Sequence, residues 1–361
     1  MLIWLAEQLG WAVQGGGDDP LGALLLRALL GLLTAVIVAL IIGRITLRVM
    51  RRLQIGEEIY ELGPQQHFSK RGTPTMGGLS ILLGLLIAIG LWVDLGSRHV
   101  WLLVLAALGF GAIGFYDDWL KSIAKRGGLS ARGKMLGQTL LALIIAAALY
   151  LGAETPGETR YLLPLFSGFS LDLGLGFIFV TWLVIVGSSN AVNLTDGLDG
   201  LASMSSALVA LGLGVIACIV SSAAGADYIR SPHIEGAGEI AVFAAALIGA
   251  LLGFLCFNAY PARIFMGDVG SLALGGVLGS MAVMLRQEVL FALMGALFVV
   301  ETVSVMLQVA SFRLTGKRIF RMAPIHHHFE QKGMPETHIV VRAWILTILC
   351  VLIGLGTLLL R

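Results

Sequence analysis

The stretch from Leu21 to Gly43, LGALLLRALLGLLTAVIVALIIG, decides the fold class, because Arg27 is its only charged residue. An apolar run of this length is long enough to cross about 30 Å of hydrocarbon as an α-helix. The stretch therefore predicts a transmembrane helix.

Similar apolar runs fill the rest of the chain. The 361 residues are 57% hydrophobic and only 13% charged, with a mean hydropathy of +0.91, whereas soluble domains are typically about 25% charged. No soluble stretch is long enough to bury a core of its own. We therefore expect an all-α integral membrane protein that forms a single domain over residues 1–361. Ten spans are expected, at about 21–43, 76–94, 100–115, 135–152, 173–189, 201–221, 239–258, 269–285, 289–312 and 338–360.

The first 20 residues differ from the spans. Leu2 to Val13 is apolar but short and carries Glu7, and a turn-like Gly-Gly-Gly-Asp-Asp-Pro run follows at 15–20. The segment has no basic n-region of the kind that begins a cleavable signal peptide. We expect residues 1–20 to be a periplasmic or interfacial segment that leads into the first span.

The connections between the expected spans differ sharply in charge. Four alternate connections carry most of the lysine and arginine, whereas the opposite connections and the C-terminus carry few. Because basic loops stay in the cytoplasm, we expect these four connections to be cytoplasmic and both termini to be periplasmic. The basic residues on this side are Arg44, Arg48, Arg51, Arg52, Lys70, Arg71, Lys121, Lys125, Arg126, Arg132, Lys134, Arg263, Arg313, Lys317, Arg318, Arg321 and Lys332.

Net charge and cysteine content exclude some functions. The net charge is only +2, so a general attraction to polyanions is not expected and nucleic acid is not a predicted partner. Cys218, Cys256 and Cys350 lie inside apolar runs without metal-type spacing. They are expected to be small buried hydrophobic residues.

Five aspartates, Asp117, Asp118, Asp196, Asp199 and Asp268, lie beside apolar runs, and the topology places them all on the cytoplasmic side. Carboxylates beside a membrane are costly, and Mg²⁺ prefers hard oxygen ligands together with substrate phosphates. The five aspartates therefore predict a magnesium site for a phosphorylated substrate. Adjacent carboxylates point in different directions, so one could orient or deprotonate the attacking group while the other serves the metal.

Other polar residues on the same side are candidates for the substrate pocket. If residues 190–200 begin a helix, Asn190, Asn193, Asp196 and Asp199 would line one face of it. Lysine supplies a compact positive charge that suits phosphate, and Lys70, Lys121 and Lys125 are candidates for this role. Phe265 is either a stacking surface for a flat base or an anchor at the membrane interface.

Three consecutive histidines, His326, His327 and His328, follow the last basic loop. They cannot all face one metal from a regular helix, so hydrogen bonding to phosphate from a loop is expected rather than a zinc site. Within the preceding span, Glu301 and Gln308 are seven residues apart and share a helix face. Because a carboxyl at membrane depth must face protein or water, the two residues either line a groove or pack in the interior.

Taken together, these segments resemble the phospho-N-acetylmuramoyl-pentapeptide transferases (MraY-type translocases) of the polyprenyl-phosphate N-acetylhexosamine-1-phosphate transferase superfamily. The resemblance covers nearly the whole chain. It is carried, in order, by KRGTPTMGG from Lys70, FYDDWLK from Phe115, NAVNLTDGLDGLA from Asn190, NAYPARIFMGDVGS from Asn258 and APIHHHFE from Ala323.

The resemblance implies that UDP-N-acetylmuramoyl-pentapeptide donates its phospho-sugar to undecaprenyl phosphate, giving lipid I and UMP in peptidoglycan synthesis. It also implies Mg²⁺ as cofactor, a homodimer and a bacterial inner-membrane location with a cytoplasmic active site. By resemblance, the residues expected in catalysis are Asp117, Asp118, Asp268, His326, His327 and His328, with Asp117 as the favoured base and Asp268 as a metal ligand. Those expected to bind substrate are Lys70, Thr75, Lys121, Lys125, Asn190, Asn193, Asp196, Gly197, Leu198, Asp199, Asn258, Phe265 and Gln308.

The alternative from another functional class is a secondary transporter of an anionic or nucleotide-sugar substrate. Transporters place ionisable groups near the bilayer midplane, often within repeated halves. In this chain most acidic residues lie at span ends on one side, and only Glu301 is deep. The residues leave open whether transfer is direct or proceeds through a covalent aspartyl-phosphate. They also leave open how Asp117 and Asp118 divide their roles, and what path the lipid tail follows.

Overall fold

A computed structural model describes residues 20–53, 70, 72–125, 127–153, 156–162 and 170–360. The predicted interfacial segment, apart from Pro20, and the basic residues Arg71 and Arg126 lie outside the described residues. The helices are α2 (Pro20–Arg52), α3 (Gly78–Trp92), α4 (Arg98–Ser122), α5 (Ala131–Leu151), α6 (Gly176–Thr195), α7 (Leu201–Val220), α8 (Ala223–Tyr228), α9 (Ala237–Asn258), α10 (Gly267–Met284), α11 (Glu288–Met294), α12 (Ala296–Thr315), α13 (Ile325–Glu330) and α14 (Glu336–Leu359). The remaining elements are a 3₁₀ turn at Pro156–Thr159 and two strands, β1 (Arg160–Leu162) and β2 (Ser170–Asp172).

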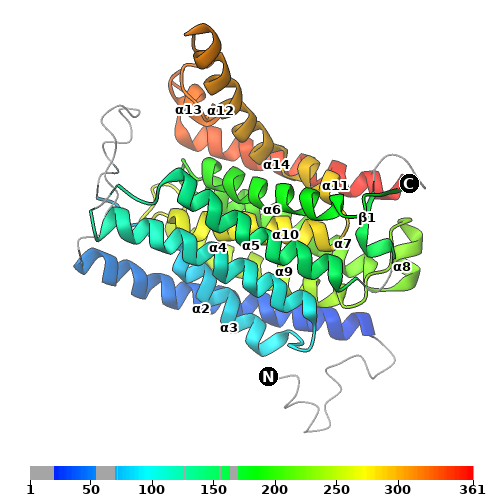
Figure 1. The fold of residues 1–361 in the computed structure, drawn as a ribbon. Coiled ribbons are helices and arrows are strands. Elements are labelled where there is room, and N and C mark those ends of the chain that lie inside the picture. The colour runs from blue at the N-terminus through cyan, green and yellow to red at the C-terminus, as the bar shows by residue number, and fades with distance from the viewer. Residues whose placement is uncertain are drawn as a thin grey trace.

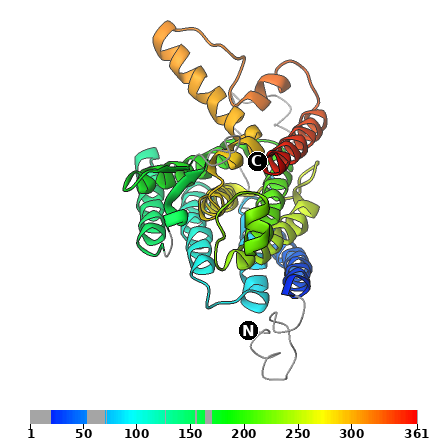
Figure 2. The same cartoon turned by 90° about the vertical axis from the view of Figure 1, so that its right-hand side faces the viewer.

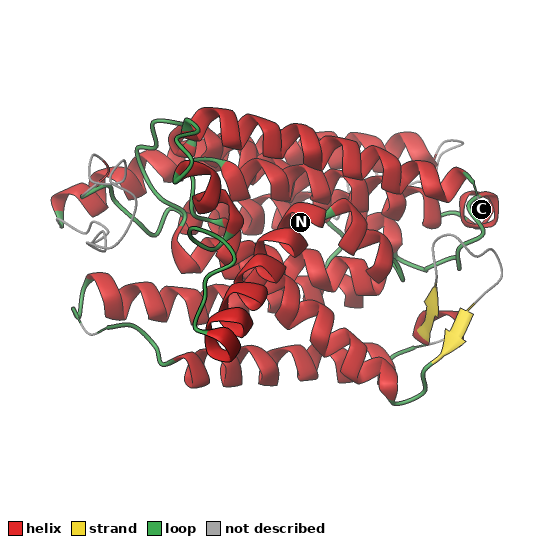
Figure 3. Cartoon of the chain, turned by 90° about the horizontal axis from the view of Figure 1, so that it is seen from above, coloured by secondary structure: helices red, strands yellow, loops and turns green. Residues whose placement is uncertain are grey.

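The described part of the chain is an all-α membrane protein, as predicted. Nine of its helices are long and apolar enough to cross a bilayer, and most of them run roughly parallel in one bundle (Figure 1). Strands β1 and β2 pair antiparallel, with Arg160 opposite Asp172. This hairpin lies at one end of the bundle, while the long connections gather at the other end (Figure 3).

Helix α10 lies at the centre of the bundle, and 89% of its residues are buried. It packs against α4 on one side and α6 on another. A Cβ on Gly275 would overlap the backbone of Ser188 in α6, so glycine is needed for this close approach. Small residues allow such contacts between membrane helices, whose association depends on van der Waals packing.

Four expected spans have different bounds in the structure. Helix α2 continues beyond the expected end at residue 43 to Arg52, so four arginines expected in the first connection extend the helix. Helix α3 covers only Gly78–Trp92, because residues 74–78 form backbone hydrogen bonds with residues 265 and 266 instead of continuing the helix. Helix α4 continues beyond the expected end at residue 115 to Ser122, so Asp117 and Asp118 lie inside it rather than at its end. Helix α6 likewise continues through Asn190 and Asn193 to Thr195.

The expected span 289–312 is not one helix. Gly295 separates α11 from α12, and α12 then leaves the bundle at a steep angle (Figures 1 and 2). Only 22% of the most apolar 18-residue stretch of α12 is buried. Figure 2 shows α12 and α14 diverging from each other, with α13 between them.

The beginning of α2 and the end of α14 lie at the same end of the bundle (Figure 1). The opposite end, formed by residues 70, 72–77, 123–125, 127–130, 196–200 and 259–266, carries most of the predicted site residues. We call it the site end.

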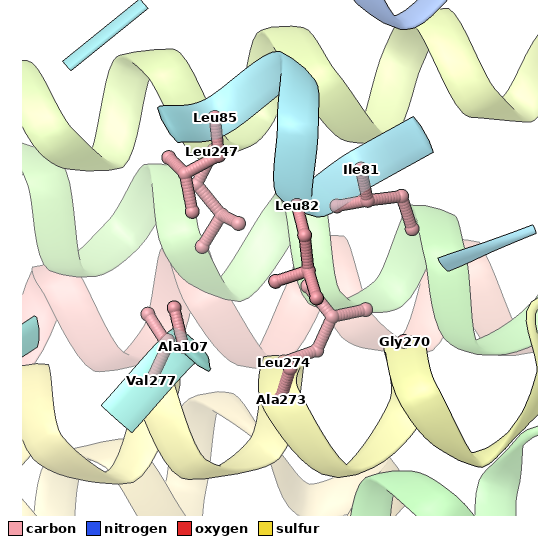
Figure 4. A pocket seen from close by; sticks show the side chains of 9 residues that line it. All are labelled: Ile81, Leu82, Leu85, Ala107, Leu247, Gly270, Ala273, Leu274 and Val277. Atoms are coloured by element: carbon pink, nitrogen blue, oxygen red, sulfur yellow. The ribbon is translucent and has the colours of Figure 1, made fainter. Parts of the chain in front are cut away.

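A small cavity lies in the bundle interior between α3, α4, α9 and α10 (Figure 4). Its lining is entirely apolar and includes Leu82, Ala107 and Leu247. Because no polar group reaches it, the cavity is a packing feature and not a site for a phosphorylated ligand.

Candidate active site

Three of the five aspartates converge at the site end. Ligand oxygens of Asp117, Asp118 and Asp268 all lie within 4.8 Å of one another. The first two belong to α4 and the third to the first turn of α10. A Cβ on Gly114 would overlap the backbone of Asp268, so this glycine allows the two helices to bring their carboxylates together. We call Asp117, Asp118 and Asp268 the aspartate trio.

Asp118 is bound to backbone. Its two carboxylate oxygens accept hydrogen bonds from the N–H groups of Asp268 and Val269, both at 3.1 Å. The first N–H groups of a helix have no partner within the helix, and a carboxylate there also interacts favourably with the helix dipole. Asp118 therefore fixes the start of α10 against α4.

Asp117 and Asp268 share two lysines. Lys121 Nζ lies 2.6 Å from Asp117 Oδ2 and 2.9 Å from Asp268 Oδ2. Lys134 Nζ lies 3.3 Å from Asp117 Oδ2 and 2.7 Å from Asp268 Oδ2. Asp117 also accepts a 2.6 Å hydrogen bond from the Leu129 N–H. The two carboxylates are thus joined by a pair of ammonium groups, of which Lys121 is about half exposed.

The two asparagines of α6 have different partners. The Asn193 amide donates to Asp268 Oδ1 at 2.6 Å and to the Ser271 hydroxyl at 2.8 Å, so this residue orients Asp268. The Asn190 amide instead donates to buried Gln138 and to the Val186 carbonyl. Residues 190–200 do not begin a helix, because the segment is the end of α6 followed by a turn.

A second charged group lies at the site end, around Lys70. The Lys70 ammonium is 2.7 Å from Asp199 Oδ1 and 2.6 Å from Glu336 Oε1. Asp199 Oδ2 accepts from the Ala262 N–H, and Glu336 Oε1 accepts from the Asp199 N–H. Burial opposes the charge of Lys70, but the hydrogen bonds to Asp199 and Glu336 raise its pKa above the usual value. Lys70 is therefore a charged link between segments that are distant in sequence.

The turn between α6 and α7 is fixed by buried contacts. Asp196 is the C-terminal cap of α6, and Leu198 is buried with Leu201 in a small apolar cluster beside α14. The Asn258 carbonyl oxygen accepts from the Gly200 N–H and the Ser203 hydroxyl, while its amide donates to the Ile264 carbonyl. Asn258 is only 3% exposed. Its hydrogen bonds join two loops, and its expected place in the substrate pocket stays a prediction.

Phe265 and Thr75 lie near the trio on paired segments. The Phe265 N–H donates to the Pro74 carbonyl, and its carbonyl accepts from the Gly77 N–H. Its ring is partly exposed. Gly267, with φ +74°, lies close to the Asp118 carboxylate and the Thr75 hydroxyl.

The remaining predicted lysine, Lys125, lies exposed in the connection between α4 and α5. It has a φ of 48°.

The three histidines lie in the short helix α13, where a loop was expected, and each has a different environment. His326 is buried, and its Nδ1 lies 3.0 Å from Glu301 Oε2. His327 Nδ1 lies 2.6 Å from Glu330 Oε2. His328 Nδ1 accepts from the Arg321 N–H, and its ring packs edge-on against Phe320. The contacts give the three rings three different roles in the fold.

Glu301 and Gln308 share a face of α12, as predicted, and both bind the segment that follows α12. The Gln308 carbonyl oxygen accepts from the N–H groups of Ile319 and Phe320, and its amide donates to the Phe320 carbonyl. These bonds use both ends of the amide, so Gln308 holds this loop in place.

The aspartate trio fits a divalent cation. Its donors are hard carboxylate oxygens, which Mg²⁺ prefers. Three carboxylates carry more negative charge than Lys121 and Lys134 neutralise, and this balance favours a further cation.

Two charged residues at the site end had no chemical role predicted from the sequence. Lys134 was expected only as a basic loop residue, and no prediction included Glu336. Glu336 does have a local signal, since it is an acidic residue in the first turn of a membrane helix. Its contact with Lys70 crosses 266 positions and cannot be read from either local sequence.

Comparison with known proteins gives two matches. The profile of glycosyl transferase family 4 matches residues 100–286, slightly more than half of the chain. Signature 1 of phospho-N-acetylmuramoyl-pentapeptide-transferase matches residues 70–82. The first match includes all five aspartates, and the second includes Lys70 and Thr75.

Proposed function

Because the chain belongs to glycosyl transferase family 4 and carries an MraY-type signature, we propose that it transfers a phospho-sugar from UDP-N-acetylmuramoyl-pentapeptide to undecaprenyl phosphate. The products are lipid I and UMP, in the first membrane step of peptidoglycan synthesis. The site end would face the cytoplasm of a bacterial inner membrane, where a soluble nucleotide meets a lipid phosphate.

The observation that carries this proposal is the convergence of Asp117, Asp118 and Asp268 beside Lys121 and Lys134. Transfer of a phospho-sugar brings two phosphate groups together, so positioning and charge neutralisation dominate the catalysis. An oxygen of the lipid phosphate would attack the β-phosphorus, and the bond from that phosphorus to the UMP oxygen would break. Lys121 is half exposed and is the residue best placed to contact an incoming phosphate.

The contacts support unequal roles within the trio. Asp118 uses both oxygens to hold the start of α10, so we assign it a positioning role. Asp117 faces the two lysines and is the stronger candidate for orienting or deprotonating the acceptor phosphate. Asp268, held by Asn193, would bind Mg²⁺ with Asp117 beside it. When bound, the ion would neutralise charge on the diphosphate.

Ten of the other predicted site residues keep their proposed places. Lys70, Thr75, Asp196, Gly197, Leu198, Asp199 and Phe265 would form or shape the nucleotide pocket, and His326, His327 and His328 would act near the diphosphate and the sugar. By family resemblance, the protein would act as a homodimer.

The transporter alternative is less well supported by the same contacts. A transporter places its binding groups near the bilayer midplane. Here the trio and the Lys70 group lie at the site end of the bundle, and Glu301, the carboxylate expected at membrane depth, is bound to His326.

The proposal is tested by incubating purified protein with both substrates and Mg²⁺ and measuring UMP release and lipid-linked product. Other nucleotide sugars replace the donor in parallel reactions. We expect release only with the muramoyl-pentapeptide donor. Release with a different nucleotide sugar would change the substrate assignment, and movement of the intact donor into proteoliposomes without release would support transport.

A further inference from the structure

Glu301 is a buried carboxylate in a membrane helix, and its side chain is only 2% exposed. A carboxylate in this environment is expensive unless it has a specific partner. Its Oε2 lies 3.0 Å from His326 Nδ1 and 3.4 Å from the His326 backbone N. Both contacts are to one residue of α13, so Glu301 fixes the position and the ring orientation of His326.

The other ring nitrogen of His326 points toward the turn between α6 and α7. His326 Nε2 is buried and has no hydrogen-bond partner within the described part of the chain. A Cβ on Gly197 would overlap this atom. Gly197 is not among the glycines with positive φ, so it is required here for space and not for backbone conformation.

These contacts form a chain from α12 through α13 to the turn at 196–198. An acceptor held on one ring nitrogen orients the whole imidazole. Any movement of the ring would press on Gly197, between Asp196 and Leu198.

We propose that Glu301 is a positioning residue that acts through His326 on the 196–198 turn and thereby sets the affinity for the uridine nucleotide. This inference rests on the proposed function, because it takes that turn as part of the nucleotide pocket. It gives Glu301 a role distinct from lining a groove for the lipid tail.

The test measures binding of UMP to the purified full chain with Mg²⁺, by calorimetry and without turnover. Glu301→Ala should weaken binding by about tenfold, the loss expected when one hydrogen bond to a charged group is removed. Gly197→Ala should weaken binding similarly, because its methyl group displaces the imidazole. His326→Ala should weaken it as well.

The decisive measurement is the double-mutant cycle. If Glu301 and Gly197 act through the imidazole, adding Glu301→Ala or Gly197→Ala to His326→Ala should cost little further affinity. A purely structural role for Glu301 in α12 would give additive losses, and additive losses would overturn the inference. If His326→Ala does not purify as folded protein, His326→Asn takes its place in the cycle.

Two control variants are available. Gly187 lies in α6, the helix that precedes the turn. The methyl group of Gly187→Ala would meet nothing within 4 Å. Thr302→Ala removes a polar group beside Glu301 whose hydroxyl bonds only within α12. Both should bind UMP as the unmutated chain does, and a loss in either that matches Glu301→Ala would overturn the inference. If the unmutated chain itself does not bind UMP, the proposed function fails rather than the coupling.

Discussion

The Lys134 ammonium lies 2.7 Å from Asp268 Oδ2 and so joins the first turn of α5 to the first turn of α10. The same nitrogen is 3.3 Å from Asp117 Oδ2. Its side chain is 18% exposed, so these interactions are weakly screened by solvent. Lys134 therefore reduces the repulsion between two carboxylates that the fold brings together.

Lys134→Met keeps the length of the side chain and removes its charge. We expect UMP release to fall by about 100-fold, because a preorganised positive group beside the reacting phosphates is lost. Arg132→Met, an exposed position on the same turn, is the control and should keep its activity. Equal activity in the two variants would contradict a role for Lys134 in the site.

Glu336→Ala removes the carboxylate shared by Lys70 and the Asp199 N–H. A buried N–H without a partner costs about 1–3 kcal/mol, so thermal unfolding in detergent should shift to lower temperature and UMP release should decrease. Glu336→Gln keeps an acceptor oxygen and should lose less of both. The control is Thr337→Ala, an exposed neighbour. Unfolding of Glu336→Ala at the temperature of this control would contradict the assignment.

Gly114→Ala tests the close packing of α4 against α10. Its methyl group would overlap the Asp268 backbone, and overpacking of this kind costs about 1–3 kcal/mol. Both the unfolding temperature and UMP release should fall, since the aspartate trio depends on this contact. Gly90→Ala in α3, where a Cβ would meet nothing within 4 Å, should change neither. A normal rate in Gly114→Ala would show that the trio tolerates a wider spacing.

His327→Ala should depress turnover while leaving the fold intact. His327 is only partly buried, so its loss should not disturb the bundle. The rate of UMP release and the unfolding temperature are measured together, with His338→Ala at an exposed position of α14 as the control. An unchanged rate would mean that His327 has a structural role only.

The spans could be predicted from sequence because hydrophobic length is a local property. The break at Gly295 could not, since a single glycine occurs inside many of the unbroken runs, and only the departure of α12 from the bundle distinguishes it. The continuation of α4 through Asp117 and Asp118 was also missed. The two aspartates were expected to mark the end of the helix. Lys121, one turn after Asp117, compensates the negative charge, and the helix continues.

The site was predicted in its residue types but not in its pairings. Topology alone placed Asp117, Asp118 and Asp268 at one end. That Asp118 binds backbone while Asp117 faces two lysines depends on how α4, α5 and α10 pack. The Glu301 contact with His326 similarly depends on α13 folding back onto α12, for which neither segment carries a local signal.

We propose that the aspartate trio supports a Mg²⁺-dependent phospho-sugar transfer. The most direct measurement is UMP release by the unmutated protein and by Asp268→Asn, each with both substrates, in Mg²⁺ and in EDTA. We expect release by the unmutated protein that EDTA abolishes, and no release by Asp268→Asn in either condition. Near-normal, Mg²⁺-dependent release by Asp268→Asn would contradict the assignment of Asp268 as a metal ligand.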